Sequence, residues 1–157
     1  MREITIEHYA LGSSATTAEA MAELAGGHFP IADRVPGAAG EAFDWHRWHN
    51  AWLKSAGREE TAGTGTPTHL AVEAADGFEA TIPWEQLTHA AVLFAVGNEP
   101  LSAAGPIRLY VPSGSSKCLN VKSIVKLKIG HNAASGEIEA SYGFKRTFSA
   151  DDLRMKK

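Results

Sequence analysis

A group of cationic and hydroxyl side chains in the second half of the chain has the composition of an anion-binding site. Residues 113–116 read Ser-Gly-Ser-Ser and are followed directly by a lysine. Gly114 permits a sharp turn that leaves backbone N–H groups without strand partners, and the hydroxyls and cations add further donors. A phosphate accepts such charge-assisted hydrogen bonds well. The candidate ligand-binding residues are Arg108, Ser115, Ser116, Lys117 and Lys122.

Two strand-like runs flank this loop and must position it. Residues 107–111 alternate and end at Pro112, which cannot donate a hydrogen bond to a sheet. From residue 121 the alternation resumes and divides the side chains into two sets: Ser123, Val125, Leu127 and Ile129 on one face, and Lys122, Ile124, Lys126 and Lys128 on the other. We expect the first set in the core and the second in solvent. The alternative to anion binding is therefore that these cations form the solvated face of a sheet.

The single cysteine offers a second kind of chemistry. Cys118 follows the same loop, and His89 or His131 could approach it in the fold and activate a nucleophilic thiolate. The alternative, which we favour, is that Cys118 is a small buried hydrophobic residue. One cysteine also excludes an internal disulfide and a zinc site built from several cysteines.

A tryptophan-rich segment predicts a helix over residues 45–56, capped by Asp44 and ended by Gly57. One face of this helix would carry Trp45, Trp48, Trp52 and Leu53, with His49 within it and His46 at its edge. Such a stripe could stack on a flat heterocycle, but an aromatic stripe at helical spacing usually belongs to the core, which is the interpretation we adopt. The two histidines are spaced to bind a metal ion; the alternative is a pair at the border of the buried face.

The amino-terminal third is predicted to contain one strand, two helices and loops. Residues 2–8 alternate as an opening strand that pairs at a sheet edge, and residues 18–25 form a helix ended by glycines. Residues 28–43 hold prolines and glycines without periodicity and are interpreted as a loop. Residues 58–67, rich in Gly and Thr, are interpreted as a linker to the remainder or a mobile loop.

The remainder is predicted to be rich in strands. Residues 68–75 and 78–82 form a hairpin around Asp76-Gly77, residues 83–87 a helical turn, and residues 90–96 a buried strand. A turn follows at 131–136, then a last strand at 137–144 and a charged tail at 151–157. We expect one domain over residues 1–157, of α+β class and mainly antiparallel or mixed β structure, with an amino-terminal helical segment (1–57) and a β-rich core (67–144).

Four pieces in the β-rich part form a recognisable series: VGNEPL at 96–101, GPIRLYVP at 105–112, SSK at 115–117 and VKSI at 121–124. Upstream, DGF at 76–78 and IPWE at 82–85 look like a hairpin and the start of a short helix. Over about residues 67–130 the chain thereby resembles the molybdopterin-binding domain of the sulfite oxidase family. The resemblance implies the fold of that domain.

The resemblance also implies molybdopterin as a cofactor, with molybdenum held by the pterin's dithiolene and by a protein cysteine for oxygen-atom or electron transfer. That cysteine lies upstream of the matched region in the family, and here no cysteine precedes Cys118. The family's histidine before the Gly-Pro strand is replaced by Ala103 or Ala104, and Ser123 stands where a tryptophan is common.

These departures lead to a non-catalytic protein as the main hypothesis, a binding or interaction module for an anionic, phosphate-bearing ligand or a protein partner. The first alternative is a molybdenum-cofactor oxidoreductase or a subunit of one, in which the protein ligand of the metal is absent or comes from another chain. The second alternative is a small cysteine-dependent enzyme that uses Cys118.

Composition sets the outer limits of these hypotheses. The 157 residues are 44% hydrophobic and 21% charged, as in ordinary soluble domains. A formal net charge of −3 provides no general attraction for nucleic acid or an anionic membrane. The sequence shows neither an apolar secretory segment nor a run as long as a membrane span, so we expect a cytoplasmic protein.

Overall fold

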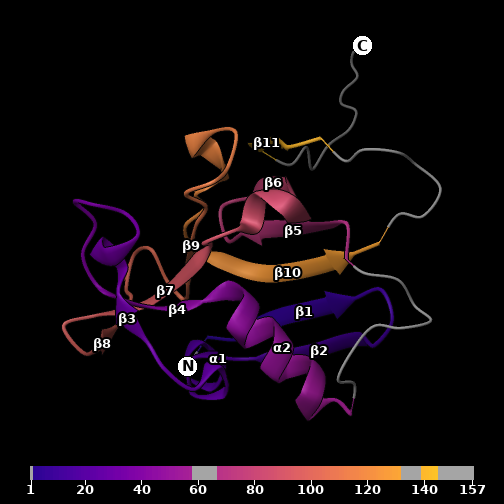
Figure 1. The fold of residues 1–157 in the computed structure, drawn as a ribbon, viewed down its shortest axis with the longest axis horizontal. Helices are drawn as coiled ribbons and strands as arrows, with labels where there is room; N and C mark the ends of the chain where they lie inside the picture. The colour runs from indigo at the N-terminus through magenta and orange to yellow at the C-terminus, as the bar shows by residue number, and fades with distance from the viewer. Residues whose placement is uncertain (1, 58–66, 132–138, 145–157) are drawn as a thin grey trace.

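The structure, a computed structural model, describes residues 2–57, 67–131 and 139–144. These residues form two α-helices and two β-sheets, which makes the fold α+β as the sequence predicts. Figure 1 shows how the helices lie beside the strands. The expected linker lies outside the described residues up to residue 66, as do residues 132–138 and the expected charged tail.

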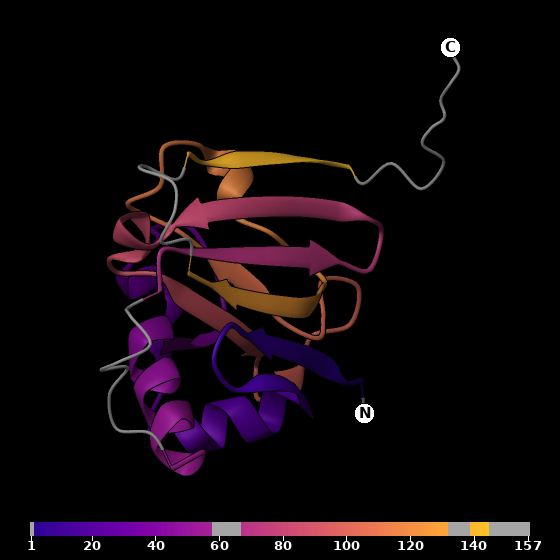
Figure 2. The same ribbon diagram turned by 90° about the vertical axis from the view of Figure 1, so that its right-hand side faces the viewer.

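The larger sheet has six strands that lie side by side in Figure 2, in the order β11-β6-β5-β10-β1-β2. Its strands are β1 (Ile4–His8), β2 (Gly12–Thr16), β5 (His69–Ala74), β6 (Phe78–Pro83), β10 (Ile124–Gly130) and β11 (Ser141–Phe144). All neighbouring strands pair antiparallel except β1 and β10, which are parallel.

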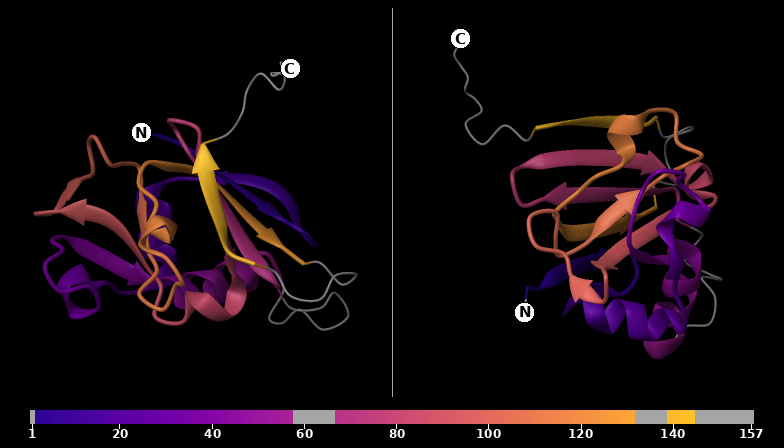
Figure 3. Two further views of the ribbon diagram at one scale, coloured as in Figure 1. Left: turned by 90° about the horizontal axis from the view of Figure 1, so that it is seen from above. Right: turned by 90° about the vertical axis from the view of Figure 1, so that its left-hand side faces the viewer.

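The smaller sheet has five strands and is antiparallel. It contains β3 (Phe29–Pro30), β4 (Glu41–Asp44), β7 (Ala91–Val96), β8 (Glu99–Pro100) and β9 (Arg108–Tyr110), with β9 paired to β7. Seen from above, the two sheets lie on opposite sides of the molecule (Figure 3). The main core lies between them and includes Ile4 of β1, Leu70 of β5 and Val92 of β7.

Two α-helices and three 3-10 turns complete the described structure. They are α1 (Ala18–Ala25), α2 (Trp45–Ser55), η1 (Ile31–Asp33), η2 (Trp84–Leu87) and η3 (Lys117–Leu119). Thr17 caps α1 by accepting the N–H of Ala20, and Gly26 ends it with a positive φ. The Asp44 carboxylate caps α2 by accepting the N–H of Arg47, as predicted. The two helices contribute to the same core, and Arg47 of α2 donates to the carbonyl of Ala25 in α1 at 2.7 Å.

The amino-terminal third contributes more to the sheets than its sequence predicts. The opening strand β1 is not at an edge, because β2 pairs with it on the outer side. Residues 28–43 are not a loop throughout: β3, η1 and most of β4 lie there. The sequence does not predict these short strands, because two to five residues are too few to show the alternation of a strand. Their pairing partners are also distant in sequence.

The face assignment of β10 is wrong at its start. Ile124 is fully buried with Leu127 and Ile129, whereas Val125 is only half-buried. The register against β5 shifts between Ile124 and Lys126, so one residue is inserted at that point. A bulge of this kind reverses the alternation, since each one-residue shift moves every side chain to the other face.

Candidate functional site

The structure brings two of the five predicted ligand-binding residues, Arg108 and Lys122, to one cavity. This cavity, here called the Arg108 cavity, has a volume of about 300 Å³. Its walls come from both sheets and from η3, and they comprise Asp76, Phe78, Arg108, Cys118, Asn120, Val121, Lys122 and Phe144.

The guanidinium of Arg108 is the distinctive polar group of this cavity. Its Nε is buried and has no hydrogen-bond partner within the part of the chain that the structure describes. No carboxylate of the described residues forms an ion pair with Arg108 or with Lys122. The ring of Tyr110 lies beside the guanidinium, with its centroid 5.0 Å from Cζ. A partly buried cation that forms no ion pair favours a bound anion over an empty site.

The other walls add a hydrogen-bond donor and an apolar side. Asn120 accepts the N–H of Val111 through Oδ1 at 2.7 Å, which leaves its amide N–H groups as donors. The rings of Phe78 and Phe144 meet edge to face with centroids 5.3 Å apart. Asp76 is the one carboxylate, and its Oδ1 accepts the N–H of Phe78 at 3.1 Å. The cavity thus combines two cations, one amide and one carboxylate with an aromatic wall.

The three remaining predicted residues do not line the Arg108 cavity. Ser115 donates its N–H to Oε1 of Gln86 at 2.8 Å, and the Ser116 hydroxyl caps η3 by accepting the N–H of Cys118. The Gly114 N–H is bonded to the Val111 carbonyl, and the Lys117 side chain is exposed. Most N–H groups that the sequence offered for an anion in this loop therefore have partners within the chain.

Cys118 is exposed, which corrects the expectation of a buried hydrophobic residue. In η3 it is the next residue, Leu119, that is fully buried, and the turn leaves the thiol on the surface. Neither histidine proposed as its base lines the Arg108 cavity. His131 instead lies at the end of β10, on another cavity.

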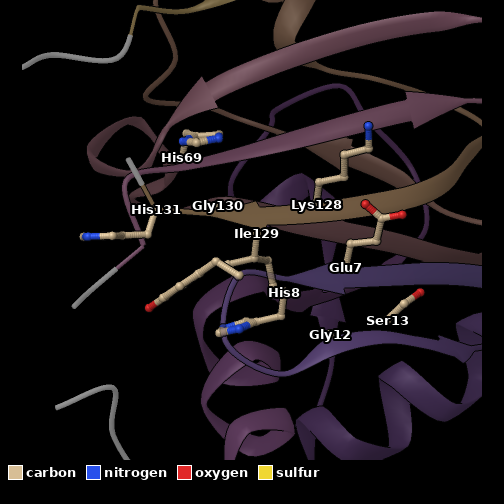
Figure 4. A pocket seen from close by; sticks show the side chains of 10 residues that line it. Glu7, His8, Gly12, Ser13, His69, Lys128, Ile129, Gly130 and His131 are labelled. Atoms are coloured by element: carbon tan, nitrogen blue, oxygen red, sulfur yellow. The ribbon is translucent and has the colours of Figure 1, made fainter. Parts of the chain in front are cut away.

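That second cavity, here called the His69 cavity, has a volume of about 590 Å³ and lies at the carboxyl ends of the parallel strands β1 and β10. Figure 4 shows the rings of His69 and His131 at one end and the side chains of Lys128 and Glu7 at the other. The remaining lining residues are His8, Tyr9, Gly12, Ser13, Ile129 and Gly130. The sequence analysis did not predict this site, since its residues come from four strands. The signal that could have pointed to it is the presence of His8, His69 and His131 at or next to strand ends.

The charges around the His69 cavity are engaged in ion pairs. Lys128 Nζ lies 2.7 Å from Glu73 Oε2, and the hydrogen bond between them raises the pKa of Lys128. Lys126 Nζ lies 3.4 Å from Glu7 Oε2. Burial lowers the pKa of His69, whose Nδ1 lies 2.9 Å from the Thr68 hydroxyl. Lys126 and Lys128 fit the solvated sheet face that was the alternative to anion binding. Arg108 is partly buried on β9 of the other sheet, and Lys122 is exposed just before β10.

The tryptophan helix is part of the core, as predicted. Trp45 is fully buried and Trp48 is 1% exposed, while Trp52 is half-buried. His46 Nε2 lies 3.2 Å from the Leu87 carbonyl. Burial, with smaller contributions from His8 and His46, lowers the pKa of His49 to about 4. Within the described ranges no group of three or more His, Cys, Asp or Glu side chains is placed to hold a metal ion.

No family model, no curated protein and no solved structure matches this chain. Among the described residues, no helix combines the length and the apolar character needed to cross a membrane.

Proposed function

We propose that this chain is a small binding domain of the sulfite-oxidase molybdopterin-domain type that holds an anionic, phosphate-bearing small molecule in the Arg108 cavity. The observation that carries the proposal is the guanidinium of Arg108, which lies partly buried in a cavity with Lys122, forms no ion pair with a described carboxylate and leaves its Nε without a hydrogen-bond partner among the described residues. A protein partner bearing a phosphate or carboxylate at this surface would satisfy the same donors.

The order of elements supports the fold part of the proposal. The hairpin β5–β6, the turn η2, the buried strand β7, the strand β9 and the strand β10 occur where the resemblance expects them. Arg108 lies on β9 and Lys122 just before β10, so the two cations come from the pieces that carry the resemblance.

The energetics set the expected affinity. Each hydrogen bond from a charged donor to a phosphate contributes about 1.5–3 kcal/mol before the cost of ordering the side chains. Two cations and one amide therefore give an affinity on the order of millimolar for inorganic phosphate alone, since association itself costs several kcal/mol. The rings of Phe78 and Phe144 would add apolar contact for a ligand with a flat ring.

Titration of the full chain with inorganic phosphate and with phenyl phosphate, followed by NMR, tests the proposal. We expect saturable shifts of the amides of Arg108, Val121 and Lys122, with tighter binding of phenyl phosphate. The double variant Arg108→Gln, Lys122→Ala should lose these shifts. Lys117→Ala is the matched control, because it removes an exposed lysine outside the cavity.

Shifts that map to residues 113–117, or that persist unchanged in the double variant, would contradict the proposal. If the double variant does not fold, Lys122→Ala alone decides: its side chain is exposed, so its removal should weaken binding without loss of structure.

A specific observation favours a second candidate, a molybdenum-cofactor oxidoreductase or a subunit of one. Cys118, the one thiol of the chain, lines the same cavity as Arg108 and Lys122. The two cations would hold the phosphate of such a cofactor and Cys118 would supply a thiolate; the bound group would contribute oxygen-atom or electron transfer. Metal and pterin analysis of protein produced with added molybdate tests this candidate. Stoichiometric molybdenum that is lost in Cys118→Ser would favour it over a non-catalytic role.

A further inference from the structure

His49 is a buried imidazole on α2 that faces the end of β1. It is 4% exposed, and its Nε2 has no hydrogen-bond partner among the residues that the structure describes. Its ring lies nearly parallel to that of His8, with centroids 6.2 Å apart. His8 is itself 5% exposed. Two imidazoles, one from a helix and one from a strand, therefore meet inside the protein.

Aromatic rings surround this pair. The His49 ring meets Trp84 of η2 edge to face at 5.2 Å, and Trp45 lies parallel to it at 6.2 Å. The His8 ring contacts Trp52 at 5.4 Å and Tyr9 at 4.4 Å. Aromatic side chains provide little solvation for a charge that has no hydrogen-bond acceptor, so the neutral imidazole is favoured at His49.

Among the described residues, the titratable groups that face the pair are mostly basic. His46 faces it from α2, and His8 and Tyr9 face it from β1 and the residue after it. From η2 the facing group is the indole of Trp84, and Glu85 is exposed. Beyond His8, the His69 cavity adds His69, His131, Lys128 and Glu7. Within the described residues no carboxylate forms an ion pair with His49.

The hydrogen bond of His8 also requires a neutral ring. Its Nδ1 accepts the N–H of Ala10 at 3.0 Å, and this bond holds the chain where it leaves β1. A proton on Nδ1 would remove the lone pair that the bond uses. Charge on either imidazole therefore disturbs the contact between α2 and the end of β1.

We propose that His49 is the sensor of an acid-operated latch between α2 and β1. Acidification adds a proton to His49, the imidazolium is left without an acceptor among the indoles and close to two other imidazoles, and the carboxyl-terminal half of α2 separates from β1. The amino-terminal half of α2 stays in place, because Asp44 is bound to Arg34 and Arg47 to the Ala25 carbonyl. Since His8 and Tyr9 line the His69 cavity, the release also changes the wall of that cavity.

The direction of the pH effect follows from the His49 pKa. It is lowered from 6.5 to about 4 in the folded chain. The latch is therefore fully closed above 6.5 and loses stability as the pH falls through the interval between these two values.

Spectroscopy of the full chain between pH 8 and pH 4 tests the latch. We expect near-UV circular dichroism and tryptophan emission to change reversibly below the ordinary histidine pKa of 6.5, while far-UV circular dichroism is retained. His49→Phe keeps a ring among the indoles but cannot be protonated, so it should move the change to lower pH. His28→Gln is the control, because His28 is exposed, follows α1 in the chain and has its ring against Phe94, away from His8 and His49.

NMR titration of the histidine ring protons in the unaltered chain gives a second readout, which also serves if His49→Phe does not fold. Under the proposal, His49 titrates well below 6.5 and together with the tertiary change. Titration of His49 at its ordinary value without a tertiary change would overturn the proposal. Simultaneous loss of near-UV and far-UV signals, equal in the unaltered chain and in His49→Phe, would also overturn it.

Discussion

The Nη1 atom of Arg34 lies 2.7 Å from Oδ1 of Asp44, while Oδ2 of the same carboxylate accepts the N–H of Arg47 at 2.8 Å. One side chain thus both caps α2 and ties it to the segment after η1. Arg34 also donates to the carbonyl of Ala90, which precedes β7. The start of the tryptophan helix is therefore tied to the smaller sheet by this carboxylate, in addition to the hydrogen bond from the Trp45 N–H to the Ala90 carbonyl.

Replacing Asp44 separates its two roles. We expect Asp44→Ala to lower the free energy of unfolding by about 1–2 kcal/mol, as for other lost N-caps, and Asp44→Asn to cost less because the amide oxygen still caps the helix. Urea unfolding at neutral pH measures both. Equal costs for the two variants would show that the ion pair, rather than the cap, carries the stabilisation.

The pH dependence of this site has a definite sign. Burial alone would raise the pKa of Asp44, but the hydrogen bonds from Arg34 and from the Arg47 N–H outweigh it and lower the pKa below 3.8. The stabilisation is present above that value and is lost as the pH falls through the lowered pKa. The stability difference between the unaltered chain and Asp44→Asn should therefore shrink in acid. A difference that is the same at neutral pH and in strong acid would contradict this assignment.

Trp48 and Trp52 of α2 should differ in their contribution to stability. Trp48 is 1% exposed, whereas Trp52 is half-buried and contacts His8 at the border of the core. We expect Trp48→Ala to cost about 3–5 kcal/mol, and Trp52→Ala distinctly less because solvent can enter the space it leaves. Denaturant unfolding of the two variants gives the comparison. A larger cost at Trp52 would mean that its contact with His8 and Trp48 matters more than its burial.

Capping and turn residues in the sequence correctly predicted the ends of the helices and the hairpin next to them. Asp44 marks the start of α2, Gly26 the end of α1 and Asp76-Gly77 the hairpin between β5 and β6, since caps and turns act within a few residues. Pairing between distant strands leaves no such mark. The parallel contact of β1 with β10 and the bulge at Ile124 follow from packing of the whole sheet. The sequence pattern alone therefore predicted an edge position for β1 and an unbroken alternation along β10, and both predictions were wrong.

The candidate site could likewise be predicted only in part, where its residues stand next to a clear local pattern. Arg108 and Lys122 could be found because they stand beside strands with a clear pattern, and they do share a cavity. Asn120, Phe78 and Phe144 could not be found, because their contribution depends on how η3 and β11 pack against β6. The N–H groups of the serine loop were expected to be open, but Gln86 and the loop itself use most of them.

Cys118 should report on occupancy of the Arg108 cavity. It is exposed and lines that cavity, so a neutral reagent such as iodoacetamide should label it in the native chain. We expect phenyl phosphate to slow this labelling, since a ligand on Arg108 and Lys122 would cover the thiol. The effect should persist in Lys117→Ala, become weaker in Lys122→Ala and disappear in the double variant Arg108→Gln, Lys122→Ala. Labelling rates that ignore phenyl phosphate in the unaltered chain would place any anion site away from this cavity.

The His69 cavity depends on the contact between Gly130 and His69. A Cβ added at Gly130 would lie 2.4 Å from Nε2 of His69, so the imidazole rests against the strand only because the residue beneath it is glycine. Elsewhere in a strand, alanine is more stable than glycine by about 0.5–1 kcal/mol, since glycine loses more backbone freedom on folding. Gly130→Ala should therefore displace the His69 ring and be neutral or destabilising, although β10 itself would prefer alanine.

In a His69→Ala background the same change should become stabilising, because the clash is gone. Unfolding measurements on the two single variants and the double variant give the coupling between the positions. Additive effects, with the same sign for Gly130→Ala in both backgrounds, would show that His69 moves aside without cost and that the glycine does not shape the cavity.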